Sequence, residues 1–177
     1  VIDWLEQADL NIDFSKLSII GHSRGGGITL LHAAQDKRVQ KVITWASVCD
    51  FEQRFPKDVS DWKAKGIDYI YNARTEQMMP LKFQFFESYH QHQFALDIPL
   101  QCSNIEQELL VIHGSNDPAV GLEEAKKIVD NVKNAHLEII PDSGHTFGAV
   151  HPAKDDNLPL DLEIVVNLSV DFLNIWV

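Results

Sequence analysis

The segment Gly21-His22-Ser23-Arg24-Gly25 constrains the fold of this chain more than any other part of its sequence. It follows the apolar run Leu17-Ser18-Ile19-Ile20 and precedes a stretch of small residues with helical character. A Gly-x-Ser-x-Gly pattern between a strand and a helix is typical of a sharp turn that exposes a nucleophilic serine. The pattern therefore predicts a strand at about 17–21, a helix at about 24–35, and Ser23 as a nucleophile at the turn between them.

The residues around Ser23 have separate predicted tasks. Gly21 and Gly25 carry no side chains, which lets the strand and the helix approach each other closely. The first N–H groups of a helix have no partner within it, so the Arg24 amide is predicted to donate to a substrate oxyanion. The glycines at 25–27 have two other interpretations, a flexible connector and a phosphate-binding loop. No Gly-Lys-Ser or Gly-Lys-Thr follows them, which disfavours the phosphate loop.

A serine hydroxyl needs a histidine base and a carboxylate that orients the histidine. Two apolar runs, at about 109–113 and 136–140, predict strands, and Asp117 and His145 follow their carboxyl ends. An amphipathic helix at about 121–132 joins these runs, so the two strands are predicted to lie parallel in one sheet. Their carboxyl ends then meet at one edge of the sheet, where such folds bind ligands. The sequence predicts Asp117 as the acid and His145 as the base.

The order serine, aspartate, histidine along the chain resembles that of the α/β-hydrolase superfamily. The matching segments are Gly-His-Ser-Arg-Gly at Ser23, His-Gly-Ser-Asn-Asp-Pro-Ala-Val at Asp117 and Ser-Gly-His-Thr-Phe-Gly at His145. Within the superfamily, the chain looks most similar to dienelactone-hydrolase-like and serine-aminopeptidase-like esterases and peptidases. The resemblance implies a three-layer α/β fold with a mostly parallel sheet.

The same resemblance implies a serine hydrolase that forms an acyl-enzyme on Ser23 and requires no cofactor. Its substrate would be a carboxylic ester, thioester or amide, either a small molecule or a peptide. Two alternatives remain open: a noncatalytic hydrolase-like binding module, and an acyltransferase that uses the same three residues.

Other acidic residues compete with Asp117 for the role of the acid. Asp50 and Glu52 follow a strand predicted at about 41–47, where some relatives of this fold place the acid. Asp142 precedes His145 by three residues and is predicted only to shape that loop.

The remaining histidines are predicted to be structural. The side chain of His22 is expected to point away from the nucleophile into the scaffold, and His113 lies at the end of a strand. His90, His92 and His151 have no acid or cysteine at ligand spacing beside them, so no metal site is predicted.

The segment at about 51–107 interrupts the alternation of strands and helices and is rich in aromatic residues. It is predicted to be a cap insert over the carboxyl edge of the sheet. Within it, residues 66–71 and 75–79 predict a two-stranded ribbon around the turn at 72–74, followed by a helix at about 80–92. The aromatic residues could wall a substrate pocket, form a satellite core, or do both.

The 177 residues are 45% hydrophobic, which is enough for one domain with a substantial core. A last helix is predicted at about 161–176 from its apolar stripe. A net charge of −11 without a basic stripe argues against nucleic acid and anionic membrane partners. Cys49 and Cys102 are too few for a disulfide scaffold, which agrees with a cytoplasmic location.

The chain begins at Val1, and the next residues predict a helix at about 1–8 before the strand that carries Ser23. The fold that it resembles has further strands upstream, and a loop after one of them supplies a second oxyanion amide. We therefore expect a C-terminal part of a larger enzyme, with N-terminal strands missing and the second donor absent from this chain. The strand before Ser23 would then be an exposed edge through which the isolated chain self-associates, with weak or no activity.

Overall fold

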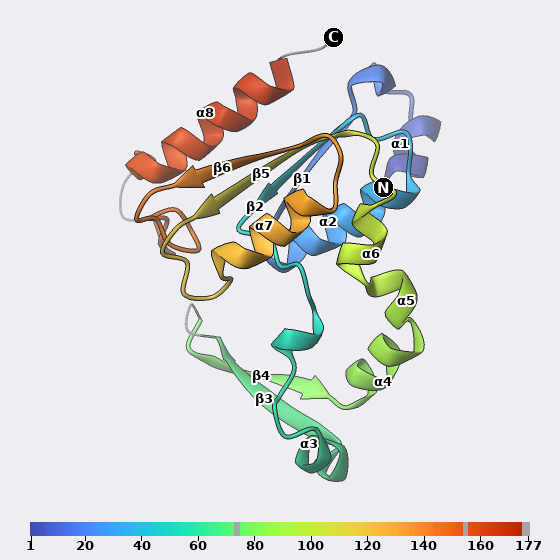
Figure 1. Cartoon of the computed structure of the whole chain (residues 1–177), viewed down its shortest axis with the longest axis vertical. Helices are drawn as coiled ribbons and strands as arrows, with labels where there is room; N and C mark the ends of the chain where they lie inside the picture. The colour runs from blue at the N-terminus through green and yellow to red at the C-terminus, as the bar shows by residue number, and fades with distance from the viewer. Residues whose placement is uncertain (73–74, 154–155, 175–177) are drawn as a thin grey trace.

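The computed structural model describes residues 1–72, 75–153 and 156–174, which are built around a four-stranded parallel sheet (Figure 1). Its strands, in hydrogen-bonded order, are β1 (Ser18–His22), β2 (Lys41–Trp45), β5 (Glu108–Gly114) and β6 (Ala135–Ile140). All three neighbouring pairs are parallel. This architecture confirms the predicted α/β fold and all four predicted strands, although β2 ends at Trp45 rather than at residue 47.

Helices cover both faces of the sheet. They are α1 (Ile2–Gln7), which follows the chain start, α2 (Arg24–Gln35), α7 (Leu122–Asp130) and α8 (Leu160–Asn174). Figure 1 shows α2 and α7 on one side of the sheet and α8 on the other. Val42 and Val111 pack on the α2 and α7 side, whereas Ile43 and Ile112 pack on the α8 side. Because both faces are buried, the middle of each central strand is a continuous apolar run, at 42–43 in β2 and 109–112 in β5.

Helix α8 begins one residue before the predicted helix. The last residues of that prediction, 175 and 176, lie outside the described part of the chain. Among the described residues, no helix combines the length and the apolar character that a membrane crossing requires.

Most of the segment between β2 and β5 extends away from the sheet toward the bottom of Figure 1, and its last helix lies beside the sheet layers. Its elements are η2 (Glu52–Arg54), α3 (Val59–Lys65), β3 (Ile67–Asn72), β4 (Gln77–Lys82), α4 (Gln84–Gln91), α5 (Gln93–Leu96) and α6 (Ile98–Cys102). A short helix, η1 (Phe14–Lys16), precedes β1.

Strands β3 and β4 pair antiparallel and confirm the predicted ribbon, whose turn residues 73 and 74 lie outside the described residues. The predicted start of the next helix at residue 80 is wrong. Pro80 and Leu81 continue the ribbon opposite Tyr69 and Asp68, and α4 begins only at Gln84. A proline has no N–H to donate, but an edge position in a two-stranded ribbon tolerates it.

The insert has an aromatic core. Trp62 is fully buried, with ring centroids 5.3 Å from Phe83 and 5.9 Å from Phe55. The contact with Phe83 is edge-on and that with Phe55 is tilted, and such aromatic packing supports a satellite core in the insert. By contrast, Ile98 and Cys102 of α6 pack in the main core beside α2. The predicted insert at about 51–107 therefore includes a final part that packs with the sheet layers.

Strand β1 lies at an edge of the sheet and, within the described residues, pairs only with β2. Its Ile20 side chain is 48% exposed. Self-association through this edge stays a prediction.

Arg38, which follows α2, connects that helix to α1. Its guanidinium lies 2.7 Å from Asp3 Oδ1, 2.6 Å from Glu6 Oε2 and 2.6 Å from Asp36 Oδ2. The hydrogen bonds from Arg38 lower the pKa of Asp36 to about 2. In an unfolded chain this carboxyl titrates near pH 4, so the folded state holds the proton less tightly. The contribution of Asp36 to stability is therefore present above about pH 4 and is lost as the pH falls toward 2.

We expect Asp36→Asn to lower the thermal midpoint at pH 6, because the charged acceptor for Arg38 is lost. The difference from the wild type should shrink as the pH falls from about 4 to about 2, where the wild-type carboxyl also becomes neutral. Thermal unfolding followed by circular dichroism across this pH range measures it. A difference that stays constant over the range would contradict the role assigned to Asp36.

Candidate active site

Ser23 occupies the turn between β1 and α2 in a strained conformation, with φ 57° and ψ −122°. Residues other than glycine rarely adopt a positive φ, and such backbone strain is typical of functional turns. The backbone of Ser23 is fixed from two sides. Its N–H donates to Trp45 O at 2.9 Å, and its carbonyl accepts from the Val48 amide at 3.2 Å. The hydroxyl is thereby held at the carboxyl end of β1.

The glycines of the turn differ in their steric role. A Cβ on Gly21 would lie 2.3 Å from Thr29 Oγ1 and 2.5 Å from the Gly25 carbonyl oxygen, so this position must lack a side chain. A Cβ on Gly25 would meet no atom of the described residues within 4 Å. The prediction that Gly25 provides the second close approach is therefore wrong. That position is Gly26, where a Cβ would lie 2.5 Å from Ser47 Oγ.

His145 bridges Ser23 and Asp117. Its Nε2 lies 2.9 Å from Ser23 Oγ, and its Nδ1 lies 2.7 Å from Asp117 Oδ2. A carboxylate can only accept, so Nδ1 carries the proton and the unprotonated Nε2 accepts from the serine hydroxyl. The structure thus brings together the three residues that the sequence predicts as nucleophile, base and acid. Their catalytic roles stay predictions.

Asp117 is shielded from water, with a side chain that is 0% exposed. Its Oδ1 accepts from the amides of Ala119 at 2.8 Å and Val120 at 2.9 Å, which leaves Oδ2 for His145. Buried His113 lies behind it, with Nε2 2.9 Å from Val120 O and 3.6 Å from Asp117 Oδ2. His113 therefore has the structural position that the sequence predicts.

The loops that carry Asp117 and His145 pack against each other. The amide of Asn116 donates to Ser143 O at 2.9 Å, and a Cβ on Gly114 would lie 2.3 Å from the same oxygen. Only a residue without a side chain fits between the two loops at this point.

The side chain of His22 does not point away from the site, which corrects the prediction for this residue. Its Nε2 lies 2.9 Å from the carbonyl oxygen of His145, and the two rings are 4.9 Å apart. His22 alternates with Gly21 along β1, so its side chain leaves on the face of the sheet where the His145 loop lies. The sequence motif around Ser23 contains no signal that would indicate this contact between His22 and His145.

The Arg24 amide is the first N–H of α2, and within the described residues it has no backbone acceptor. It belongs to the residue after Ser23, which supplies one of the two oxyanion donors in folds of this kind. The prediction for this amide agrees with the geometry of the turn.

The competing acids are occupied elsewhere. Asp50 Oδ1 accepts from the Glu52 amide at 2.8 Å, so Asp50 starts the η2 turn. The Glu52 side chain is 58% exposed and faces His90 at 3.9 Å. Asp142 adopts φ 57°, and its amide donates to Ser115 Oγ at 2.8 Å, which fits the predicted role in shaping the loop.

Burial raises the pKa of the Cys49 thiol to about 11 and that of Cys102 to about 12, so both stay protonated at neutral pH. Neither thiol is therefore a nucleophile there. In the part of the chain that the structure describes, no three histidine, cysteine or carboxylate side chains form a metal-binding group.

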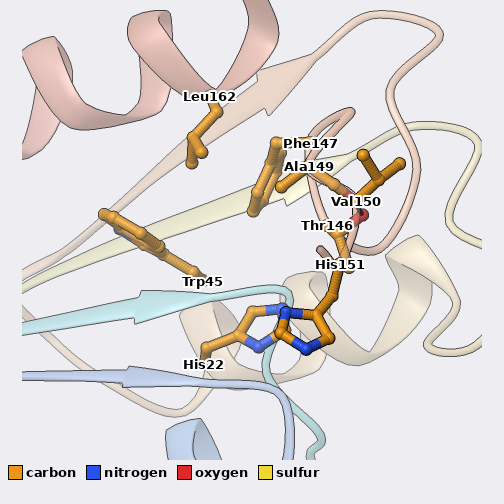
Figure 2. Close-up of a pocket in the computed structure, with 8 residues that line it drawn as sticks. All are labelled: His22, Trp45, Thr146, Phe147, Ala149, Val150, His151 and Leu162. Carbon is orange, nitrogen blue, oxygen red and sulfur yellow. Dashed lines mark hydrogen bonds between the residues drawn. The ribbon is translucent and has the colours of Figure 1, made fainter. Parts of the chain in front are cut away.

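Two pockets adjoin the site. One, of about 280 Å³, has Trp45, Phe147 and Leu162 on its apolar wall, with His22 at one end (Figure 2). The other, of about 290 Å³, lies between α2 and the insert. It is lined by Arg24, Ile28, Phe51, Phe85, Ser88, Tyr89 and Leu96. Aromatic residues of the insert therefore wall a pocket that begins one residue from Ser23, in addition to forming the insert core.

A parallel sheet covered by helices on both faces, with the nucleophile turn at the carboxyl end of β1, defines the α/β-hydrolase class. The model of the prolyl oligopeptidase family matches residues 1–158, and the chain belongs to this family of serine hydrolases. It is 28% identical to the serine hydrolase BPHL of Mus musculus, in an alignment that covers 77% of this chain and 50% of the relative. The chain thus spans about half the length of this curated relative.

Solved structures share the fold at low identity. Est1E from Butyrivibrio proteoclasticus has a TM-score of 0.67 and 18% identity, over 97% of this chain and 64% of Est1E. The α/β-hydrolase GrgF from Penicillium sp. sh18 has a TM-score of 0.62 and 16% identity, over 97% of this chain and 67% of GrgF. These likenesses confirm the predicted fold, and the family match over residues 1–158 confirms the predicted superfamily. The narrower resemblance to dienelactone-hydrolase-like and serine-aminopeptidase-like members stays a prediction.

Proposed function

We propose that the protein hydrolyses a carboxylic ester, thioester or amide through an acyl-enzyme on Ser23. The observation that carries this proposal is the position of His145, whose two ring nitrogens contact Ser23 Oγ and Asp117 Oδ2 at 2.9 Å and 2.7 Å. Membership of the prolyl oligopeptidase family and the serine hydrolase relative support the same chemistry.

In the proposed reaction, Ser23 Oγ attacks the substrate carbonyl carbon while His145 Nε2 takes the hydroxyl proton. Asp117 stabilises the imidazolium through Nδ1, and the Arg24 amide donates to the oxyanion of the tetrahedral intermediate. Collapse of this intermediate expels the leaving group, which receives the proton from Nε2. Water then attacks the acyl-enzyme in the same way and releases the acid.

The pocket between α2 and the insert, of about 290 Å³, favours substrates with an apolar acyl group. Ile28, Phe51, Phe85 and Tyr89 supply most of its wall, and such walls bind apolar ligand surface by removing it from water. One solved structure of Est1E holds ferulic acid, an aromatic carboxylic acid. We therefore propose small aromatic or medium-chain acyl esters as the first substrates to test.

Labelling with a fluorophosphonate tests the proposed nucleophile. We expect the reagent to attach to Ser23 and to no other serine, because within the described residues only Ser23 Oγ contacts a histidine that is oriented by a buried carboxylate. Peptide mass spectrometry identifies the modified residue, and heat-denatured protein is the control. Labelling of another serine, or of native and denatured protein alike, would contradict the assignment.

A series of p-nitrophenyl esters distinguishes the remaining alternatives. We expect a burst of p-nitrophenol followed by steady turnover, with phenylpropanoyl and octanoyl esters preferred over the acetyl ester. Absence of both the burst and the label would favour a noncatalytic binding module. A product that is mostly the ester of an added alcohol would favour an acyltransferase.

A further inference from the structure

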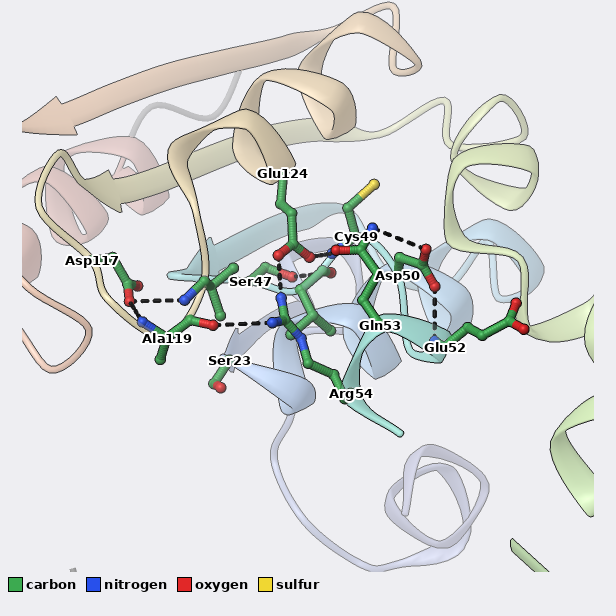
Figure 3. A network of polar contacts seen from close by, with 12 residues as sticks. Ser23, Ser47, Cys49, Asp50, Glu52, Gln53, Arg54, Asp117, Ala119 and Glu124 are labelled. Carbon is green, nitrogen blue, oxygen red and sulfur yellow. Dashed lines mark hydrogen bonds and ion pairs between the residues drawn. The ribbon is translucent and has the colours of Figure 1, made fainter. Parts of the chain in front are cut away.

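Arg54, at the end of the η2 turn, reaches from the insert to the loop that carries Asp117 (Figure 3). Its Nη1 donates to the carbonyl oxygen of Ala119 at 3.0 Å. Its Nη2 forms an ion pair with Glu124 Oε1, in the first turn of α7. The other oxygen of Glu124 accepts from the Cys49 amide at 2.8 Å. Arg54 therefore joins the insert to the segment after β5, and Glu124 joins that segment to Cys49 after β2.

The contacts of Glu124 with Arg54 and Cys49 are partly shielded from water, whereas the hydrogen bond from Arg54 to Ala119 lies at the surface. The side chain of Arg54 is 24% exposed and that of Glu124 is 12% exposed. Hydrogen bonds between charged groups are shorter and stronger than neutral ones, and water competes less for them where the exposure is low. The ion pair therefore holds the Arg54 guanidinium more firmly than the exposed pair of Lys65 and Asp61 is held in the same insert.

Ala119 links Arg54 to the proposed catalytic acid. The Ala119 carbonyl accepts from Arg54, while its N–H donates to Asp117 Oδ1 at 2.8 Å. That hydrogen bond fixes the rotation of the carboxylate, whose Oδ2 faces His145. We propose that Arg54 is a positioning residue, which holds the 117–120 loop so that Asp117 Oδ2 stays aligned with His145 Nδ1. The inference rests on the proposed function, since it assigns a role to Arg54 through Asp117.

The η2 turn also touches the proposed substrate pocket. Phe51, which precedes η2, lines the pocket between α2 and the insert, and its carbonyl accepts from the Arg54 amide at 3.1 Å. One short turn thus presents an aromatic ring to the pocket and a guanidinium to the acid loop.

We expect Arg54→Met to lower kcat by about 10- to 100-fold with little change in KM. A small displacement of a catalytic group has a cost of this order, whereas the pocket that binds the substrate keeps its wall. Steady-state kinetics with the preferred p-nitrophenyl ester measure both constants. Lys65→Met, which removes an exposed cation of the same insert, is the matched control and should leave kcat unchanged. A lower kcat in both variants, or an effect on KM alone, would overturn the inference.

The double variant Arg54→Met/Glu124→Gln separates positioning from stability. Loss of Arg54 alone leaves the Glu124 carboxylate partly buried without its cation, and this destabilises the fold. The second change removes that unpaired charge, so thermal stability should rise toward the wild-type value while kcat stays low. Recovery of kcat together with stability would mean that Arg54 serves only as the partner of Glu124, and the inference would be wrong.

A cycle with Asp117→Asn tests whether Arg54 acts through the acid. We expect Arg54→Met to have almost no further effect on kcat in the Asp117→Asn background, because the group that it positions is already lost. An equal loss in both backgrounds would refute positioning through Asp117. The failure of the proposed function itself gives a different result, since the wild-type protein would then be neither labelled at Ser23 nor active on the p-nitrophenyl esters.

Discussion

Replacement of Ser23 or His145 by alanine is expected to lower kcat by about 10⁶-fold, and the double variant is expected to be hardly worse than either. The two residues act as a unit, because Ser23 Oγ loses its proton only to His145 Nε2, which lies 2.9 Å away. Removal of one member therefore leaves the other without a function. Single-turnover kinetics on a p-nitrophenyl ester measure the three variants.

Ser103→Ala is a suitable control, because the hydroxyl of this exposed serine donates to Leu100 O in α6 at 2.7 Å, away from the site. Its activity should equal that of the wild type. If the losses of Ser23→Ala and His145→Ala multiplied in the double variant, or if Ser23→Ala kept its turnover, the proposed acyl-enzyme mechanism would be untenable.

The second large effect is expected for Asp117→Asn, which should reduce kcat by about 10⁴-fold. An amide in this position can donate to His145 Nδ1, so the imidazole proton moves to Nε2 and the base can no longer accept from Ser23. The asparagine keeps the size of the side chain, and its carbonyl oxygen can still accept from the Ala119 amide. The thermal midpoint should therefore stay close to that of the wild type.

Asp50→Asn is the informative control for this experiment, since Asp50, like Glu52, competes with Asp117 for the role of the acid, and its carboxylate accepts from Glu52 and Gln53. Its kcat should stay within a few-fold of the wild type. Nearly normal activity of Asp117→Asn together with a crippled Asp50→Asn would place the acid after β2 instead of β5.

The strands and the three site residues could be predicted because the information is local in the sequence. Apolar runs that are buried on both faces mark β2 and β5, and a parallel sheet brings the residues after its strands to one edge. The order of Ser23, Asp117 and His145 along the chain then specifies the arrangement of the site.

The sequence predictions fail where contacts between separate segments of the chain determine the structure. The contact of Arg54 with Ala119 joins residues 65 positions apart, and no local pattern announces it. The close approach at Gly26 depends on Ser47, in the loop that follows β2. Gly25 completes the sequence motif without such a contact. Likewise, the start of α4 is set by the pairing of Pro80 with Tyr69.

The η2 turn also indicates where the sequence can be joined to that of a relative in a chimaera. Recombination after Arg54 would replace the outer insert, including the ribbon and α4, and would keep both Phe51 and the hydrogen bond to Ala119. Recombination at residue 50 would bring a foreign turn against the 117–120 loop. In the first chimaera the remaining walls of the pocket change while the native contact with the acid loop persists. New specificities are therefore most accessible to this scaffold by exchange of the segment that starts at residue 55.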